Sequence, residues 1–308
     1  MPTAGETAFR EIAKLNPLSR NSLASVTGLN IPTSGGWIHT EPRTPLAQLD
    51  EIPSPYVNQL MKPNTVSYLE TYRGCPLSCT FCEWGTSDKS GSVFSAEYLA
   101  AELSAYSQQD VAAVFLVDAG LNLNARGFRN LCAAEAEVGF LKSANFWCEI
   151  YPAHVRDEHL DFLSDIGPSY LGIGLQSLDP EVLKAHQRPF NQPRFESSIN
   201  QLTSVSEGEV QIIFGLPLDS PLGFLRTLEY ARSLPVAVRA YHCLVLPAAL
   251  MTQSQADWDV QYDPTTLEMT SCRGWSPREL EDMRDRLTSE AIGSGGRSGN
   301  YWWFLPRI

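Results

Sequence analysis

Six short apolar runs constrain the fold of this chain more than any other feature of its sequence. Each run has the length of a buried strand, and the stretches between them show helical periodicity, which is typical of parallel strands joined by crossover helices. The runs lie at residues 66–72, 112–118, 145–151, 169–177, 209–215 and 236–246. We therefore predict an α/β fold in which six β/α units form an open or partial barrel, with its reactive site at the carboxyl ends of the strands.

Helix start signals support this order of elements. A side chain that can cap a helix stands before four of the helical stretches, in two cases followed by proline at the first helical position. These signals are Ser95, Asp157, Asp179 with Pro180, and Ser220 with Pro221. After the sixth run, Ser276 and Glu279 have capping-box spacing and predict one more helix.

The same patterns predict three segments. Residues 1–64 are rich in Pro, Gly, Ser and Thr and show no sustained periodicity, so we expect an irregular N-terminal arm. Residues 65–250 should form a partial (β/α)6 TIM-like barrel. Residues 251–308 should form a C-terminal extension that contains a helix and a glycine-rich tail.

Charge and composition argue against two classes of partner. The formal net charge is −12 and no run of Lys or Arg occurs, whereas a nucleic-acid-binding surface needs a basic face. The N-terminus lacks the features of a signal peptide, and no apolar run is long enough to span a bilayer. We therefore expect no nucleic-acid partner, no membrane partner and a cytoplasmic location.

Three cysteines crowd the loop that follows the first run. Cys75, Cys79 and Cys82 form a Cys-x3-Cys-x2-Cys motif. A structural zinc site needs four ligands and no second pair completes one, while a disulfide would leave one thiol over. Thiolates suit an iron–sulfur cubane, in which three cysteines leave one iron open to a small molecule. Zinc and a disulfide stay as alternatives, but the position of the motif at a strand end favours the cluster.

The motif and its position resemble those of radical S-adenosylmethionine (SAM) enzymes. The resemblance covers about residues 65–290 and implies a [4Fe–4S] cluster on the three cysteines, with the amino and carboxylate groups of SAM on the fourth iron. It implies cleavage of SAM to a 5′-deoxyadenosyl radical, which abstracts hydrogen from a small-molecule or peptide substrate. An electron donor such as flavodoxin or ferredoxin is the implied protein partner.

The resemblance also implies contacts to SAM from the fourth strand. In YLGIGLQSLD, Gln176 matches a strand-end Gln that contacts the ribose, and in VLKAHQR, Arg188 matches an Arg that binds the methionine carboxylate. A planar guanidinium suits that task because it meets a carboxylate with two parallel hydrogen bonds. The alternative for Arg188 is a solvated arginine at a helix end.

Four further residues are candidates for contacts to SAM by the same resemblance. Asp118 stands in place of the Gly-Gly-Glu turn of the family, and Glu149 lies on the third strand, where relatives contact the amino group or the ribose. Gln211 stands where relatives often have a ribose-binding Asp, and Phe81 is expected near the adenine. The structural alternatives are a turn residue for Asp118, an ion pair for Glu149 and core packing for Phe81.

Three residues near the end of the predicted barrel are candidates for completing the reaction. Tyr241 and Cys243 lie on the sixth run, and Cys272 lies in SCRGWS. A phenol or a thiol can return a hydrogen atom to a substrate radical. The alternative is that these side chains only pack in the core, as isolated buried cysteines commonly do.

Several stretches are most similar to the cobalamin-binding branch of radical SAM proteins. They are LAQLDEIPSPYV, CTFCEWG, QSLDPEVLKAHQR and LVLPAAL. In that branch a cobalamin-binding domain precedes the arm and supports methyl transfer, and too few residues precede the arm here for such a domain. We therefore favour a cobalamin-free enzyme of natural-product or peptide metabolism. The alternatives are a cobalamin-dependent methyltransferase subunit that works with a separate cobalamin-binding protein, and a non-catalytic iron–sulfur or SAM-binding accessory protein.

Overall fold

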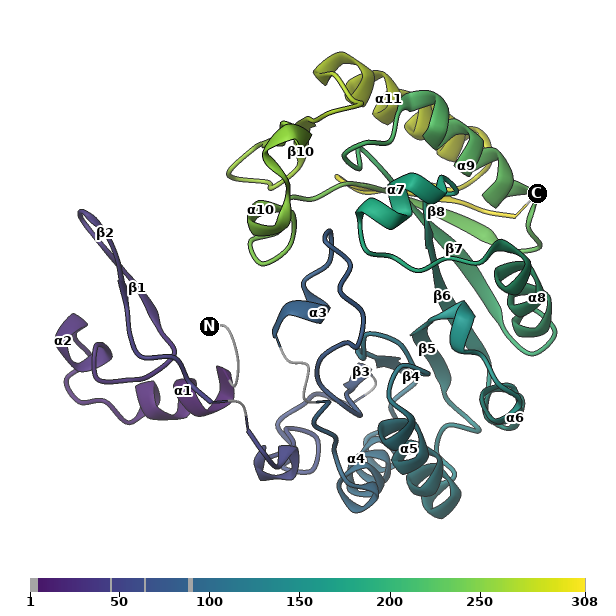
Figure 1. Ribbon diagram of the computed structural model, residues 1–308. Coiled ribbons are helices and arrows are strands. Elements are labelled where there is room, and N and C mark those ends of the chain that lie inside the picture. The colour runs from purple at the N-terminus through teal and green to yellow at the C-terminus, as the bar shows by residue number, and fades with distance from the viewer. Residues whose placement is uncertain (1–4, 45, 64, 88–90, 308) are drawn as a thin grey trace.

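A curved sheet forms the centre of the computed structural model, which describes residues 5–44, 46–63, 65–87 and 91–307 (Figure 1). The eight strands described follow the order β11-β12-β8-β7-β6-β5-β4-β3. The run from β3 to β8 is parallel throughout. Its strands are β3 Val66–Leu69, β4 Ala113–Leu116, β5 Asn145–Ile150, β6 Ser169–Gln176, β7 Glu207–Phe214 and β8 Ala237–His242.

These parallel strands coincide with the six apolar runs, which confirms the predicted α/β partial barrel. Strands β3 and β11 stand at the two ends of the sheet order, so the barrel is open. Figure 1 shows helices along the convex side of the sheet. The concave side and the carboxyl ends of the strands are therefore left for a site.

Helices connect the parallel strands. They are the short α3 Trp84–Ser87, α4 Ala96–Gln108, α5 Ala125–Val138, α6 Asp157–Asp165, α7 Pro180–Ala185, α8 Gln192–Leu202 and α9 Pro221–Ser233, with the short η2 Pro152–His154 before α6. Ser95, Asp179 and Ser220 cap their helices as predicted. Asp157 was predicted to cap α6, and this was wrong by one residue. Arg156 is the N-cap, and the backbone N–H of Arg156 donates to the ring of His159. No helix in the described ranges is long and apolar enough to cross a membrane.

The C-terminal extension adds antiparallel strands to the barrel. Helix α11 is capped by Ser276 and Glu279 in the predicted capping box. The tail then forms a strand that the sequence did not predict, paired with β8, because Trp303 and Leu305 alternate into the core. The elements are α10 Leu250–Gln253, η3 Ala256–Trp258, β9 Gln261–Tyr262, β10 Met269–Ser271, α11 Pro277–Gly293, β11 Arg297–Ser298 and β12 Trp302–Leu305.

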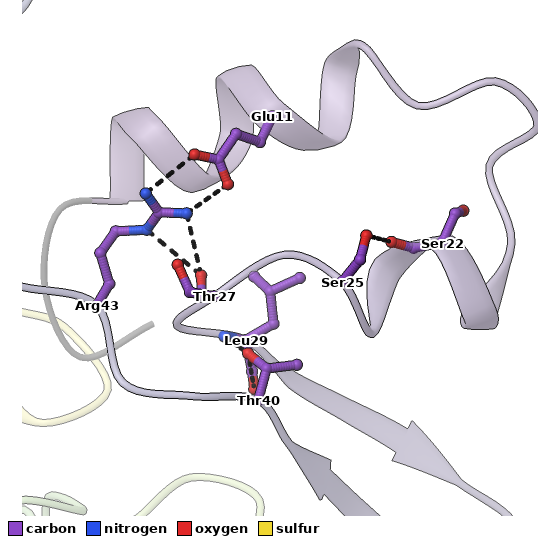
Figure 2. A network of polar contacts seen from close by, with 7 residues as sticks. All are labelled: Glu11, Ser22, Ser25, Thr27, Leu29, Thr40 and Arg43. Carbon is purple, nitrogen blue, oxygen red and sulfur yellow. Dashed lines mark hydrogen bonds and ion pairs between the residues drawn. The ribbon is translucent and has the colours of Figure 1, made fainter.

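The N-terminal arm is more regular than its composition predicted. It contains α1 Gly5–Ala13, α2 Arg20–Leu23, β1 Asn30–Thr33, β2 Gly36–His39 and η1 Leu49–Glu51. A small apolar core joins Ala8 of α1 and Ile31 of β1 to Val26 and Leu29, which lie between α2 and β1. Arg43 holds this unit together, because its guanidinium pairs with the Glu11 carboxylate and donates to the Thr27 carbonyl oxygen (Figure 2). Residue 64, the last residue of the predicted arm, lies outside the described residues.

Candidate functional site

A pocket of about 450 Å³ lies at the carboxyl ends of strands β3 to β7. It is lined by all three motif cysteines and by all six residues for which we predicted contacts to SAM. These residues are Cys75, Cys79, Cys82, Phe81, Asp118, Glu149, Gln176, Arg188 and Gln211. They come from the cysteine loop, from four strands or strand ends and from the loop after α7, so the parallel sheet is what brings them together.

The cysteine loop presents three free thiols to this pocket. Cys75 and Cys79 are buried and Cys82 is partly buried. Burial raises the pKa of Cys75 and raises that of Cys82 to about 11. The backbone N–H of Leu77 donates to the Cys75 sulfur over 3.4 Å.

The arrangement of the thiols differs from a mononuclear metal site. Among the described residues, no group of three or more His, Cys, Asp or Glu side chains is arranged around a single metal ion. A cubane cluster binds each cysteine through a different iron, so its thiolates need not converge on one point. Three thiols around one pocket, with a guanidinium and several amide and carboxylate side chains, fit a [4Fe–4S] cluster with SAM beside it.

Arg188 is held tightly at the edge of the cysteine loop. Its Nη2 donates to the Gly174 carbonyl oxygen over 2.6 Å, and its Nη1 lies 3.8 Å from the Cys79 sulfur. The guanidinium also lies over the ring of Tyr151, 5.1 Å from its centroid. Arg188 is therefore not a solvated helix-end arginine, and its charge faces the pocket.

The end of strand β6 has an unusual backbone that places Gln176. The strand pairing shifts between Gly174 and Gln176, and Gln176 has a φ of +73°, which few residues other than glycine adopt. A Cβ on Gly174 would lie 2.6 Å from Gln176 Nε2 and 2.8 Å from Arg188 Nη2. A larger residue at position 174 would therefore displace the ends of these two side chains, and a strained strand end of this kind is common at binding sites.

Glu149 and Gln211 form a pair across the floor of the pocket. Gln211 Nε2 donates to Glu149 Oε1 over 2.9 Å. Burial raises the Glu149 pKa to about 7, and the Gln211 hydrogen bond only partly opposes this. The hydrogen-bond partner of the carboxylate is an amide, so the geometry differs from the ion pair considered as an alternative.

Asp118 anchors the start of the cysteine loop. Its Oδ1 accepts the backbone N–H of Thr71 over 2.8 Å, and its Oδ2 accepts the Thr71 hydroxyl. Burial raises the Asp118 pKa to about 7. These contacts favour a structural part for Asp118, and a contact to SAM stays a prediction.

The three candidates for hydrogen-atom return do not line this pocket. Cys243 and Cys272 are buried, and the Cys272 thiol lies 3.6 Å from the Gly215 carbonyl oxygen. Tyr241 pairs in register with Trp302 of β12. A catalytic role for these three residues stays a prediction, and the geometry of the pocket does not support it.

Tyr151 is a pocket residue that the sequence reasoning missed. Besides lying under Arg188, it donates its hydroxyl to the Pro189 carbonyl oxygen over 2.8 Å. It is the last residue of the third apolar run. A position at a strand's carboxyl end was the signal that could have identified it.

A sequence model of the radical SAM superfamily matches residues 69–231, which is more than half of the chain. The chain belongs to the radical SAM superfamily. This membership confirms the predicted family and implies a [4Fe–4S] cluster and SAM as its cofactors. It also confirms the prediction of an enzyme.

Two curated relatives are methyltransferases. The 2-(S-pantetheinyl)-carbapenam-3-carboxylate methyltransferase of Streptantibioticus cattleyicolor is 28% identical over 251 residues, which are 71% of this chain and 35% of that protein. The cobalamin-dependent radical SAM methyltransferase TokK of Streptomyces tokunonensis is 25% identical over 247 residues, again 71% and 35%. The similarity to the cobalamin-dependent branch is thereby confirmed. The chain spans about a third of the length of these relatives.

A solved structure shows the same fold. The radical SAM methyltransferase TsrM of Kitasatospora setae, with tryptophan substrate and a SAM analogue bound, superposes with a TM-score of 0.64 at 16% sequence identity. The superposition covers 85% of this chain and 56% of that one. This likeness supports the partial barrel found in the described residues.

Proposed function

We propose that this radical SAM protein holds a [4Fe–4S] cluster through Cys75, Cys79 and Cys82 and cleaves SAM to a 5′-deoxyadenosyl radical, which abstracts a hydrogen atom from a small-molecule or peptide substrate. The observation that carries this proposal is the gathering of all nine predicted cluster and SAM residues around one pocket. The fold alone would permit many other reactions.

Different side chains of the pocket would bind the cluster and the different groups of SAM. The three thiols are the ligand set for the cluster, and Arg188 supplies the positive charge that a methionine carboxylate needs. Gln176, Glu149 and Gln211 supply hydrogen-bonding groups for the ribose and the amino group of SAM. When bound, the cluster supplies one electron to the sulfonium of SAM, whose C5′–S bond breaks to give methionine and the radical.

The apolar part of the pocket wall supports this chemistry. The apolar residues Leu77, Leu116, Val117 and Ile150 form part of its wall. An apolar wall excludes water, which protects a radical from side reactions. The electron would come from a donor such as flavodoxin or ferredoxin, and the cytoplasmic location inferred from the sequence suits such a partner.

Methyl transfer with cobalamin is the second candidate function. It is favoured by the two curated relatives, both named as methyltransferases, one of them cobalamin-dependent. In this case residues 65–290 supply the radical SAM part, and cobalamin is bound by another domain or by a separate protein. The two candidates share the cluster and the SAM pocket and differ in the fate of the methyl group.

One experiment tests both candidates. The cluster is reconstituted under anaerobic conditions, and dithionite and methyl-labelled SAM are added with and without hydroxocobalamin. Formation of 5′-deoxyadenosine without cobalamin supports the first function, whereas transfer of label to cobalamin supports the second. A fully loaded cluster that forms no 5′-deoxyadenosine would overturn the first candidate, and no transfer of label when the cobalamin-binding domain or protein is also supplied would overturn the second.

A further inference from the structure

His186 lies at the centre of a buried hydrogen-bond bridge beside the cysteine loop. Its side chain is fully buried, directly after α7. Its Nδ1 lies 2.6 Å from the Thr80 hydroxyl oxygen, and its Nε2 lies 2.9 Å from the Pro217 carbonyl oxygen. The backbone N–H of Thr80 also donates to the His186 carbonyl oxygen over 3.2 Å. One imidazole thus joins the cysteine loop to the loop that follows β7.

The chemistry of the two partners determines the protonation of this ring. A carbonyl oxygen can only accept, so Nε2 must carry a proton and donate to Pro217. Burial lowers the His186 pKa, so the ring is neutral and Nδ1 has a free lone pair. The Thr80 hydroxyl therefore donates to Nδ1. The donor and the acceptor of both hydrogen bonds in the bridge are therefore determined.

The bridge is close to the groups that handle the cluster and SAM. Thr80 directly follows Cys79, and His186 is two residues before Arg188. Gln187 between them has a φ of +53°, a costly turn for a residue other than glycine. That turn lets His186 face Thr80 while Arg188 faces the Cys79 sulfur.

Aromatic packing fixes the ring on two sides. The Phe81 ring centroid lies 5.8 Å from that of His186, and the Trp258 centroid lies 4.8 Å away. Trp258 is buried and comes from the C-terminal extension. Three parts of the barrel therefore meet at His186: the cysteine loop, the strand-end loop with Pro217, and the extension.

We propose that His186 is a positioning residue, which uses its bond to Thr80 to hold the cysteine loop and the Arg188 guanidinium in the arrangement that binds SAM. This inference rests on the proposed function of the pocket and adds a residue that the resemblance did not suggest. His186 itself does not line the pocket, so it acts through Thr80 and through the turn at Gln187.

Matched substitutions separate the two bonds of the bridge. Thr80→Val removes the hydroxyl at nearly constant volume, and Thr80→Ser keeps it. His186→Asn keeps an acceptor near Nδ1, whereas His186→Gln keeps a donor near Nε2. His159→Gln changes a second buried histidine, on α6, whose Nδ1 accepts the Arg156 N–H away from the pocket, and it controls for general loss of stability.

The first measurement is SAM binding by the reconstituted cluster. Electron paramagnetic resonance of the reduced protein, with SAM titrated in, reports the shift of the cluster signal. We expect Thr80→Val to need about tenfold more SAM than the wild type, as loss of one buried hydrogen bond would cause. Thr80→Ser and His159→Gln should titrate as the wild type. Loss of iron confined to Thr80→Val and the His186 variants would support the inference equally, because the loop would then no longer present its cysteines.

The second measurement needs neither cluster nor SAM. Nitrogen-15 NMR of histidine in the apo-protein should show the His186 ring, assigned as the signal that His186→Gln removes, with a slowly exchanging Nε2 proton and an Nδ1 acceptor. His159 and His242, whose Nδ1 atoms accept from Arg156 and Arg284, share this tautomer, and their signals should remain in that variant. An Nδ1-protonated His186 ring would overturn the bridge. Thr80→Val with full iron and unchanged SAM titration would overturn the positioning part, as would equal losses in His159→Gln. If the wild type binds SAM but forms no product, the proposed function fails while this inference stands.

Discussion

Arg188 and Cys79 are 109 residues apart in the chain, yet Arg188 Nη1 lies 3.8 Å from the Cys79 sulfur. The parallel sheet produces this contact, because β3 and β6 deliver their following loops to the same end of the barrel. The same guanidinium faces the pocket, where it can bind a carboxylate.

Replacement of Cys79 tests the cluster ligands. We expect Cys79→Ala to lose its iron and all 5′-deoxyadenosine formation, since two thiols do not hold a cubane. Iron analysis and product assay after anaerobic reconstitution provide the measurement. Cys132→Ala, which changes a free cysteine on α5 outside the pocket, should keep both properties. Retention of the full iron content by Cys79→Ala would rule out this ligand set.

Replacement of Arg188 tests the carboxylate contact. Arg188→Lys keeps the charge but loses the planar fork, so we expect the KM for SAM to rise about tenfold or more with the cluster intact. Arg194→Lys is the matched control, because Arg194 is exposed on α8. An unchanged KM in Arg188→Lys would contradict bidentate binding. The assay is initial-rate formation of 5′-deoxyadenosine over a range of SAM concentrations.

Gly174 tests whether the bulge at the end of β6 shapes the site. A Cβ there would press on Gln176 Nε2 and Arg188 Nη2 at 2.6 and 2.8 Å. We expect Gly174→Ala to displace these side chains and weaken SAM binding by about tenfold while the iron content stays normal. Gly35→Ala serves as control, since nothing lies within 4 Å of its Cβ position. Wild-type SAM titration in Gly174→Ala would show that neither side chain needs its present position.

Much of the barrel could be predicted because each of its buried parallel strands corresponds to one short apolar run in the sequence. The tail strand β12 was missed because its pairing partner β8 is distant in sequence, so no local pattern shows that this strand joins the sheet between β11 and β8. The hairpin of β1 and β2 was also missed, although Ser34 and Gly35 stand between two strands in the way that a two-residue turn requires.

Part of the candidate site could likewise be predicted from the sequence, and part could not. Its cysteines, Gln176 and Arg188 were predicted because short motifs at strand ends resemble those of radical SAM enzymes. The bridge between Thr80 and His186 joins residues 106 positions apart, and no local pattern encodes it. Cys243 and Cys272 had suitable chemistry but lie outside the pocket, because residue type alone does not specify which way a side chain faces.

Glu149 predicts a pH dependence of stability in the apo-protein. Burial raises its pKa to about 7 in the folded chain, whereas an unfolded Glu titrates near 4.3, so between these values the folded state binds more protons. Stability should therefore fall as pH rises from about 5 to about 8, by up to about 3 kcal/mol from this group.

Asp118 and Glu102, whose pKa values burial also raises to about 7, act in the same direction and stay present in a Glu149→Gln variant. The measurement is therefore the difference between wild type and Glu149→Gln in the free energy of unfolding by urea, at pH 5 and at pH 8. We expect the variant to lose less stability over this interval, because its amide carries no charge to desolvate while still pairing with Gln211. Parallel pH curves for the two proteins would mean that the Glu149 carboxylate is solvated and keeps its ordinary pKa.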